Sequence, residues 1–177
     1  DKDYSRFFSY ISFFTFAMLL LVMSDNFIQM FIGWEGVGLA SYLLIGFWHS
    51  KASAISANLK AFLVNRIGDL FFIIGVVIIF SIFNSFNFSV IFDEINYLKD
   101  PNDLANLELA CLFLFIGAMA KSAQIPLHIW LPDSMEGPTP ISALIHAATM
   151  VTAGIFLIIR LSPIYEVSTY TMDTILI

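Results

Sequence analysis

Hydrophobic residues fill most of the chain, and polar residues interrupt them at a few points. Five apolar stretches follow one another, each long enough to cross a bilayer as a helix of about 17–25 residues. They run over residues 7–23, 27–48, 61–83, 107–130 and 140–161. The pattern therefore predicts an all-α integral membrane protein of about five transmembrane helices, in which residues 1–177 form a single membrane domain.

The polar connections between the predicted spans differ in length. Residues 24–26 form a tight break, and residues 49–60 form a longer polar connection. The one long hydrophilic segment covers residues 84–106, and residues 89–98 within it predict a short helix at the membrane surface. The predicted spans therefore make up more than half of the chain.

Pro126 lies inside the fourth predicted span. Proline lacks the backbone N–H and disrupts a helix. Broken helices at membrane depth are tolerated only inside protein or beside a cavity. We therefore expect this span to be interrupted between Lys121 and Trp130. A simple helix end at the membrane interface is the alternative reading of Pro126.

Composition agrees with a membrane protein and excludes several functions. The chain is 59% hydrophobic and 12% charged, with a mean hydropathy of +0.84, whereas a soluble domain carries about 25% charged residues. No basic patch for nucleic acid is present. One cysteine, Cys111, excludes an intramolecular disulfide. Without metal-ligand spacing or a Gly-rich nucleotide loop, we expect no metal and no cofactor in this chain.

Lys121 is a cation within a lipid-compatible stretch, residues 110–126, of the fourth predicted span. A charged residue at the centre of a membrane helix costs about 2.5–3.5 kcal/mol and usually has a function. Gly117 and Ala118, one turn earlier, leave room for water beside it. A lysine between apolar surroundings and a carboxylate changes its affinity for a proton when the carboxylate moves. We interpret Lys121 as a proton carrier, and a fixed cation that pairs with an acid is the alternative.

Glu35 is a second charged residue inside a predicted span. It lies among three glycines in residues 33–38, and small neighbours allow another backbone or water to approach. Two opposite charges are each costly alone in a membrane, so we predict that Glu35 and Lys121 approach each other across adjacent helices. A static ion pair that fixes helix packing is the alternative.

His146 is the third ionisable group of interest. Ser142 and Thr149 lie one turn before and after it, which predicts a polar stripe on an apolar helix. Histidine titrates near neutrality and relays protons well. We therefore predict that His146 receives a proton from Lys121, with a hydrogen-bonded core histidine as the alternative.

Three further polar residues are candidates for a supporting role. Arg66 and Asp69 lie one turn apart near the start of the third predicted span. They fit an interfacial pair as well as a functional one. His128 falls in or beside the connection between the last two spans, where loop polarity is favoured over a proton entrance.

Four blocks of the sequence resemble chain 5 of respiratory complex I, a family of antiporter-like proton-pumping subunits. The blocks are FIGWEGVGLASYLLIG at 31–46, KAFLVNRIGD at 60–69, AMAKSAQIPLHIWLPD at 118–133 and MEGPTPISALIHAATM at 135–150. The first block is similar to chain 5 rather than to the related chains 2 and 4.

The resemblance implies a role for each matching residue. Glu35 corresponds to the glutamate of the family's fifth helix, Lys121 to the lysine of its broken seventh helix and His146 to the histidine of its eighth. Arg66 and Asp69 correspond to the charged pair of the sixth. In the family these residues form an input half-channel and the start of a central polar axis. The implied architecture is one antiporter-like repeat, helices 4–8, with the second inverted repeat absent.

The resemblance also implies a function. The chain would be a subunit of NADH:ubiquinone reductase that couples electron transfer to proton pumping, while FMN, iron–sulfur clusters and ubiquinone are bound elsewhere in the complex. Implied partners are other membrane subunits, especially antiporter-like chain 4, a second chain carrying the C-terminal half, and lipids. The implied location is the mitochondrial inner membrane, ahead of a bacterial plasma membrane. A Na⁺/H⁺ antiporter subunit and a structural membrane scaffold are the alternatives.

Overall fold

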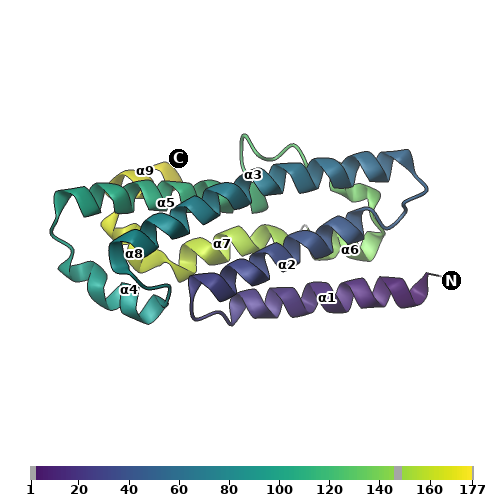
Figure 1. Cartoon of the computed structure of the whole chain (residues 1–177). Helices are drawn as coiled ribbons and strands as arrows, with labels where there is room; N and C mark the ends of the chain where they lie inside the picture. The colour runs from purple at the N-terminus through teal and green to yellow at the C-terminus, as the bar shows by residue number, and fades with distance from the viewer. Residues whose placement is uncertain (1–2, 146–148, 177) are drawn as a thin grey trace.

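The computed structural model describes residues 3–145 and 149–176, and it is a bundle of helices (Figure 1). Four of the described helices are long and apolar enough to cross a membrane: α1 (Tyr4–Val22), α2 (Phe27–Ile45), α3 (Ala52–Phe83) and α5 (Pro101–Lys121). A further apolar helix, α7 (Met150–Arg160), is shorter. The predicted all-α membrane class is confirmed.

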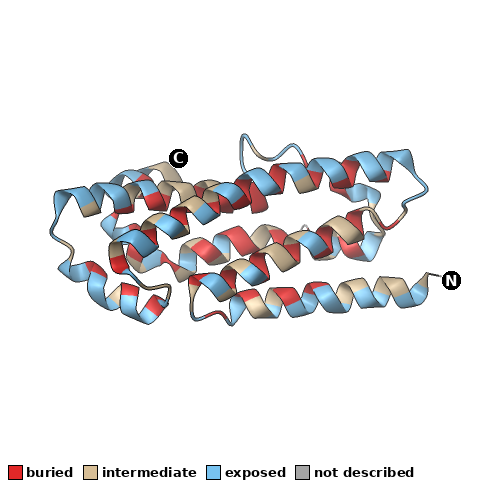
Figure 2. Cartoon of the chain, in the orientation of Figure 1, coloured by how far each residue is buried: buried red, intermediate tan, exposed pale blue. Residues whose placement is uncertain are grey.

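Short helices connect the long ones or follow α7. They are α4 (Phe88–Glu94), η1 (Ile95–Tyr97), η2 (Asp133–Glu136), α6 (Thr139–Ala143), α8 (Ser162–Val167) and α9 (Thr169–Leu176). The predicted surface helix at residues 89–98 corresponds to α4 and η1. Buried residues lie where helices face one another, and α1 exposes much of its outer side (Figure 2).

Helix α3 begins earlier than the hydropathy pattern predicts. Residues 52–60 were expected to belong to a polar connection, but they form the first turns of this 32-residue helix. The segment contains no proline or glycine, and its Lys60 forms an ion pair with Asp133. At a rise of 1.5 Å per residue, α3 is about 48 Å long and exceeds the thickness of a hydrocarbon core of about 30 Å.

The fifth predicted span corresponds to α6 and α7. Residues 146–148 between them lie outside the described residues. Thr149 precedes α7 with φ −142° and ψ −57°, which is not helical geometry. Its hydroxyl donates a hydrogen bond to the carbonyl of Leu144 at 2.8 Å.

Helix α5 ends beside the middle of α3, in the interior of the bundle (Figure 1). Glycines allow these two helices to pack closely. A Cβ atom on Gly68 of α3 would overlap the side chain of Ala120, and one on Gly117 of α5 would lie 3.1 Å from the Cβ of Phe72. The close packing holds the end of α5 at a fixed level along α3.

Candidate functional site

Two side-chain hydrogen bonds join the end of α5 to later parts of the chain. The helix stops at Lys121, and Ala123 follows with a left-handed φ of 51°. The indole N–H of Trp130 donates to the carbonyl of Ala120 at 3.0 Å, and the hydroxyl of Ser122 donates to the carbonyl of Val151 at 2.8 Å. The Trp130 bond satisfies one of the carbonyls that a helix end leaves without a partner inside the helix.

These contacts confirm the predicted interruption between Lys121 and Trp130. The helix ends five residues before Pro126, which lies exposed in the turn after it. The break is therefore held by the hydrogen bonds of Ala120 and Ser122, and Pro126 lies in the turn that follows them.

Lys121 is buried at this break. Its side chain is 1% exposed, and its ammonium lies 3.8 Å from Oδ1 of Asp69 on α3. The ammonium also lies 5.4 Å from the ring centroid of Trp34. Among the described residues the nitrogen has no hydrogen-bond partner. The lysine thus has an opposite charge close by, but no contact at hydrogen-bonding distance that holds the charge in place.

Asp69 is fixed from the other side by an indole. The side-chain N–H of Trp34 donates to Oδ1 of Asp69 at 2.7 Å, and the Trp34 ring stacks on Phe72 with centroids 5.1 Å apart. Asp69 is therefore positioned between α2 and α5. This role of Trp34 is not evident from the sequence, where the only signal is an indole N–H donor next to Glu35.

Glu35 pairs with Arg66 and not with Lys121. A carboxylate oxygen of Glu35 lies 2.5 Å from the guanidinium of Arg66, and the two side chains are 22% and 46% exposed. The Arg66 guanidinium also lies 4.9 Å from the ring centroid of Phe62. The pair sits farther outward on the bundle than the buried Lys121–Asp69 pair.

The two ion pairs are neighbours, so Glu35 and Lys121 are connected indirectly. Arg66 and Asp69 lie one turn apart on α3. On α2, Gly38 follows Glu35 by one turn, and a Cβ atom at Gly38 would lie 2.8 Å from the Lys121 ammonium. The four charged residues therefore form one chain across three helices. Because α3 begins at residue 52, Arg66 and Asp69 lie near its middle and not near its start.

The remaining predicted residues are placed as follows. His146 lies outside the described residues. Ser142 is half-buried on α6, and Thr149 stands before α7, so these two do not share one regular helix as the predicted stripe required. His128 is exposed in the turn after α5. The structure brings together Glu35, Arg66, Asp69 and Lys121, and it adds Trp34 and Gly38 to them.

Comparison with known proteins places these residues in a wider context. Residues 24–177 match the family model described as "NADH:quinone oxidoreductase/Mrp antiporter, TM". The chain is 55% identical to NADH-quinone oxidoreductase subunit L of Neisseria meningitidis serogroup A, over 98% of this chain and 27% of that protein. It is 56% identical to NADH-ubiquinone oxidoreductase chain 5 of Chondrus crispus, over 95% of this chain and 26% of that protein.

A solved structure shares the fold. The structure of the Mrp complex from Dietzia sp. DQ12-45-1b contains a chain with 30% sequence identity and a TM-score of 0.83, over 93% of this chain and 18% of that chain. The chain spans about a quarter of the length of the curated relatives it matches.

Proposed function

The chain belongs to the NADH:quinone oxidoreductase/Mrp antiporter family of membrane proteins, and on this premise we propose that it is a proton-translocating membrane subunit of respiratory complex I. In this proposal the complex transfers electrons from NADH to a quinone, and this chain moves protons without redox chemistry or a bound cofactor of its own. Support comes from relatives at 55–56% identity that are named as oxidoreductase subunits.

The observation that carries the proposal is the burial of Lys121 at a broken helix end. Its ammonium is within 3.8 Å of a carboxylate but makes no hydrogen bond to the described residues. An ion pair buried in a membrane stabilises a structure most when its charged groups are in direct contact and the N–H groups of the cation donate hydrogen bonds. A pair held at longer range can exchange its charge state when a neighbouring charge moves.

The neighbouring charge in this site is Arg66. While Glu35 holds Arg66, Asp69 has Lys121 as its counter-ion, and the ammonium form of the lysine is stabilised. If Arg66 turns to Asp69, one turn away on the same helix, the lysine loses that counter-charge and releases its proton. Glu35 thus acts on Lys121 through Arg66. We propose His146 as the next acceptor.

The second candidate function is a subunit of a multisubunit Na⁺/H⁺ antiporter. The matching family model includes both NADH:quinone oxidoreductase subunits and Mrp antiporter subunits. The similarity to a chain of the Mrp complex structure is the observation that favours the antiporter function. Identity of 30% to that chain, against 55% and above to oxidoreductase subunits, supports the complex I assignment.

We further propose antiporter-like chain 4 and other membrane subunits as partners. The proposed location is the mitochondrial inner membrane, with a bacterial plasma membrane as the alternative because close bacterial relatives exist.

Replacement of Lys121 by Met in the assembled complex tests this function. We expect assembly and NADH oxidation to persist while the number of protons pumped per NADH falls, because Met keeps the apolar volume and cannot carry a proton. Lys99→Met, at an exposed position after η1, is the matched control. An unchanged proton-to-electron ratio would favour a structural scaffold, and pumping that requires sodium would favour the antiporter.

A further inference from the structure

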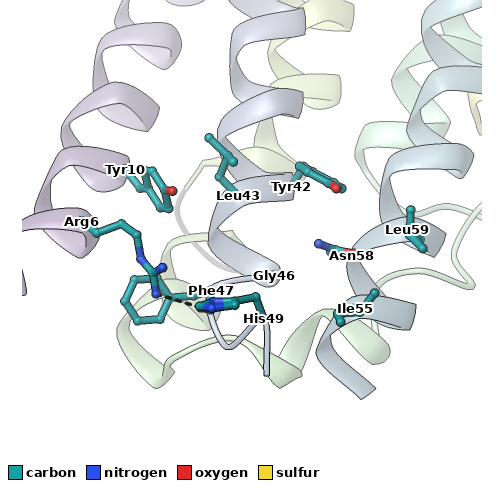
Figure 3. Close-up of a pocket in the computed structure, with 10 residues that line it drawn as sticks. All are labelled: Arg6, Tyr10, Tyr42, Leu43, Gly46, Phe47, His49, Ile55, Asn58 and Leu59. Atoms are coloured by element: carbon teal, nitrogen blue, oxygen red, sulfur yellow. Dashed lines mark hydrogen bonds between the residues drawn. The ribbon is translucent and has the colours of Figure 1, made fainter. Parts of the chain in front are cut away.

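One end of the bundle, where α1 begins and α2 ends, carries a recess whose polar side chains can donate hydrogen bonds. The recess encloses about 810 Å³ including its open mouth. Its polar lining consists of the Arg6 guanidinium, the Tyr10 and Tyr42 hydroxyls, the His49 imidazole and the Asn58 amide (Figure 3). None of the ten described residues that line it carries a carboxylate. The charge and the donors of the recess therefore suit an anion.

The Arg6 guanidinium has N–H groups that the described part of the chain leaves unused. A guanidinium carries five N–H donors in a planar fork. Nη2 of Arg6 donates to the carbonyl of Phe47 at 3.3 Å and lies 3.5 Å from Oδ1 of Asp3, while Nε has no hydrogen-bond partner. The Asp3 side chain is 45% exposed, so this ion pair is weak. Arg6 can therefore bind a second anion, and its fork matches the oxygens of a phosphate group.

An aromatic groove adjoins the recess, because Phe47 lines both. The groove encloses about 680 Å³ including its open mouth. Aromatic rings make up most of its lining, namely Tyr4, Phe7, Phe8, Phe47 and Trp48, and Asp3 also lines it. The Phe47 ring contacts Phe7 and Trp48 edge-on, with centroids 5.7 and 5.1 Å apart, and the Arg6 guanidinium lies 4.7 Å from its centroid. Phe47 thus stands between a cationic recess and an apolar groove.

Both features lie at the depth where lipid headgroups meet the hydrocarbon. Asn58 precedes the buried Asp69 on α3 by about 16 Å, at a rise of 1.5 Å per residue. Half of a hydrocarbon core is about 15 Å thick. With Asp69 at the centre of the bilayer, the recess therefore lies at its boundary. Tyr4 and Trp48 at the same end of the bundle are residue types that are enriched at membrane–water interfaces.

We infer that this end of the bundle binds an anionic phospholipid, with its phosphate in the recess beside Arg6 and an acyl chain in the aromatic groove beyond Phe47. Basic pockets between membrane helices typically bind acidic headgroups. Lys51, whose ammonium lies 5.9 Å from the centroid of the Trp48 ring, adds a second cation at the same end. A headgroup with a positive charge finds no carboxylate in the recess, so a lipid with a net negative charge is favoured.

Photo-crosslinking in the assembled complex tests the site. The probe is phosphatidylglycerol that carries a diazirine on the acyl carbons nearest the glycerol, mixed into phosphatidylcholine vesicles that contain the complex. Mass spectrometry of peptides locates the adducts. We expect stronger labelling at Phe7, Phe8 and Phe47 than at Phe16, which is 62% exposed on α1 but lines neither the recess nor the groove. Labelling of the groove no stronger than labelling at Phe16 would overturn the site.

Substitution of Arg6 tests the phosphate contact. Arg6→Gln should lower labelling of the groove at least about fivefold, because one basic residue near the surface favours anionic lipid by about that factor. Arg6→Lys keeps the charge and should retain most of the labelling. Arg160→Gln is the matched control, since the Arg160 guanidinium also donates to a carbonyl, that of Ser24 at 3.2 Å, and lies 3.6 Å from Asp25, but at the other end of the bundle. Equal labelling in the native and Arg6→Gln complexes, or an equal loss in Arg160→Gln, would overturn the contact.

Competition in the native complex identifies the ligand and does not depend on the assembly of any variant. Excess unlabelled phosphatidylglycerol should displace the probe, and the same excess of phosphatidylcholine should not. Equal displacement by the two lipids would overturn the selectivity for an anionic headgroup. Displacement by inorganic phosphate alone would assign the recess to a free anion and overturn the lipid assignment. The readout is lipid binding, so these outcomes are distinct from failure of the proposed function, which would show as normal pumping by Lys121→Met.

Discussion

Replacement of Asp69 by Asn would remove the counter-charge of Lys121 while keeping the shape of the side chain. The amide oxygen of Asn can still accept the hydrogen bond from the Trp34 indole, which is 2.7 Å long in the native protein. The native ammonium and carboxylate are 3.8 Å apart, and their side chains are 1% and 5% exposed. The substitution therefore isolates the electrostatic contribution of Asp69 to the charge state of Lys121.

The interaction energy that Asp69→Asn removes is larger than the energy of moving one charge through the membrane potential. Two unit charges about 4 Å apart interact by about 4 kcal/mol at an effective dielectric constant of about 20. This exceeds the roughly 2.3 kcal/mol needed to move one charge through 100 mV. Without the carboxylate, the charged form of Lys121 has no opposite charge in contact with it, so the lysine can no longer hold its proton as the native pair does.

The assay is proton translocation by the assembled complex in sealed vesicles, measured per NADH oxidised. We expect Asp69→Asn to reduce the ratio strongly, and Asp93→Asn, on the exposed side of α4, to leave it unchanged. A double variant with Lys121→Met should pump no worse than Lys121→Met alone, because both changes act on one pair. A normal ratio in a fully assembled Asp69→Asn complex would refute the role assigned to this pair.

Two further substitutions test the parts around the central pair. Glu35→Gln frees Arg66 to turn toward Asp69, so we expect a partial loss of protons pumped per NADH. The loss should be smaller than that caused by Lys121→Met, and an equal loss would show that Glu35 acts directly on proton transfer. Trp130→Phe removes the indole hydrogen bond to the buried carbonyl of Ala120, which then keeps only the backbone N–H of Ala123 at 3.4 Å as a donor. The loss of such a hydrogen bond costs about 0.5–1.5 kcal/mol. We expect a lower melting temperature of the purified complex for Trp130→Phe than for Trp48→Phe, at the end of the bundle, and equal values would show that the cap contributes no stability.

The hydropathy pattern predicted the membrane helices because lipid requires long apolar segments with internally bonded backbone. It failed at the start of α3, where polar residues continue a helix beyond the membrane thickness. The reason lies far away in sequence, because this part of α3 packs beside η2, where Asp133 forms an ion pair with Lys60. A local pattern contains no information about such a partner.

The charged residues of the site could also be found from the sequence, because a charge in an apolar segment is conspicuous. Their pairing could not be found. Which side chain Glu35 meets depends on how α2 and α3 are rotated against each other. That rotation depends on close contacts such as the one between Gly46, at the end of α2, and the side chain of Asn58 on α3. The hydrogen bond from Trp34 to Asp69 depends on the same rotation.

The central claim is that Lys121 acts by gaining and losing a proton, and Lys121→Arg in the assembled complex tests it most directly. Arginine keeps a positive charge at all accessible pH values, so it preserves a fixed cation opposite Asp69 and removes a switchable one. The measurement is the number of protons pumped per NADH oxidised. We predict that Lys121→Arg assembles and oxidises NADH but pumps as poorly as Lys121→Met. A Lys121→Arg complex that pumps at the native ratio would contradict the account and assign Lys121 to a fixed structural charge.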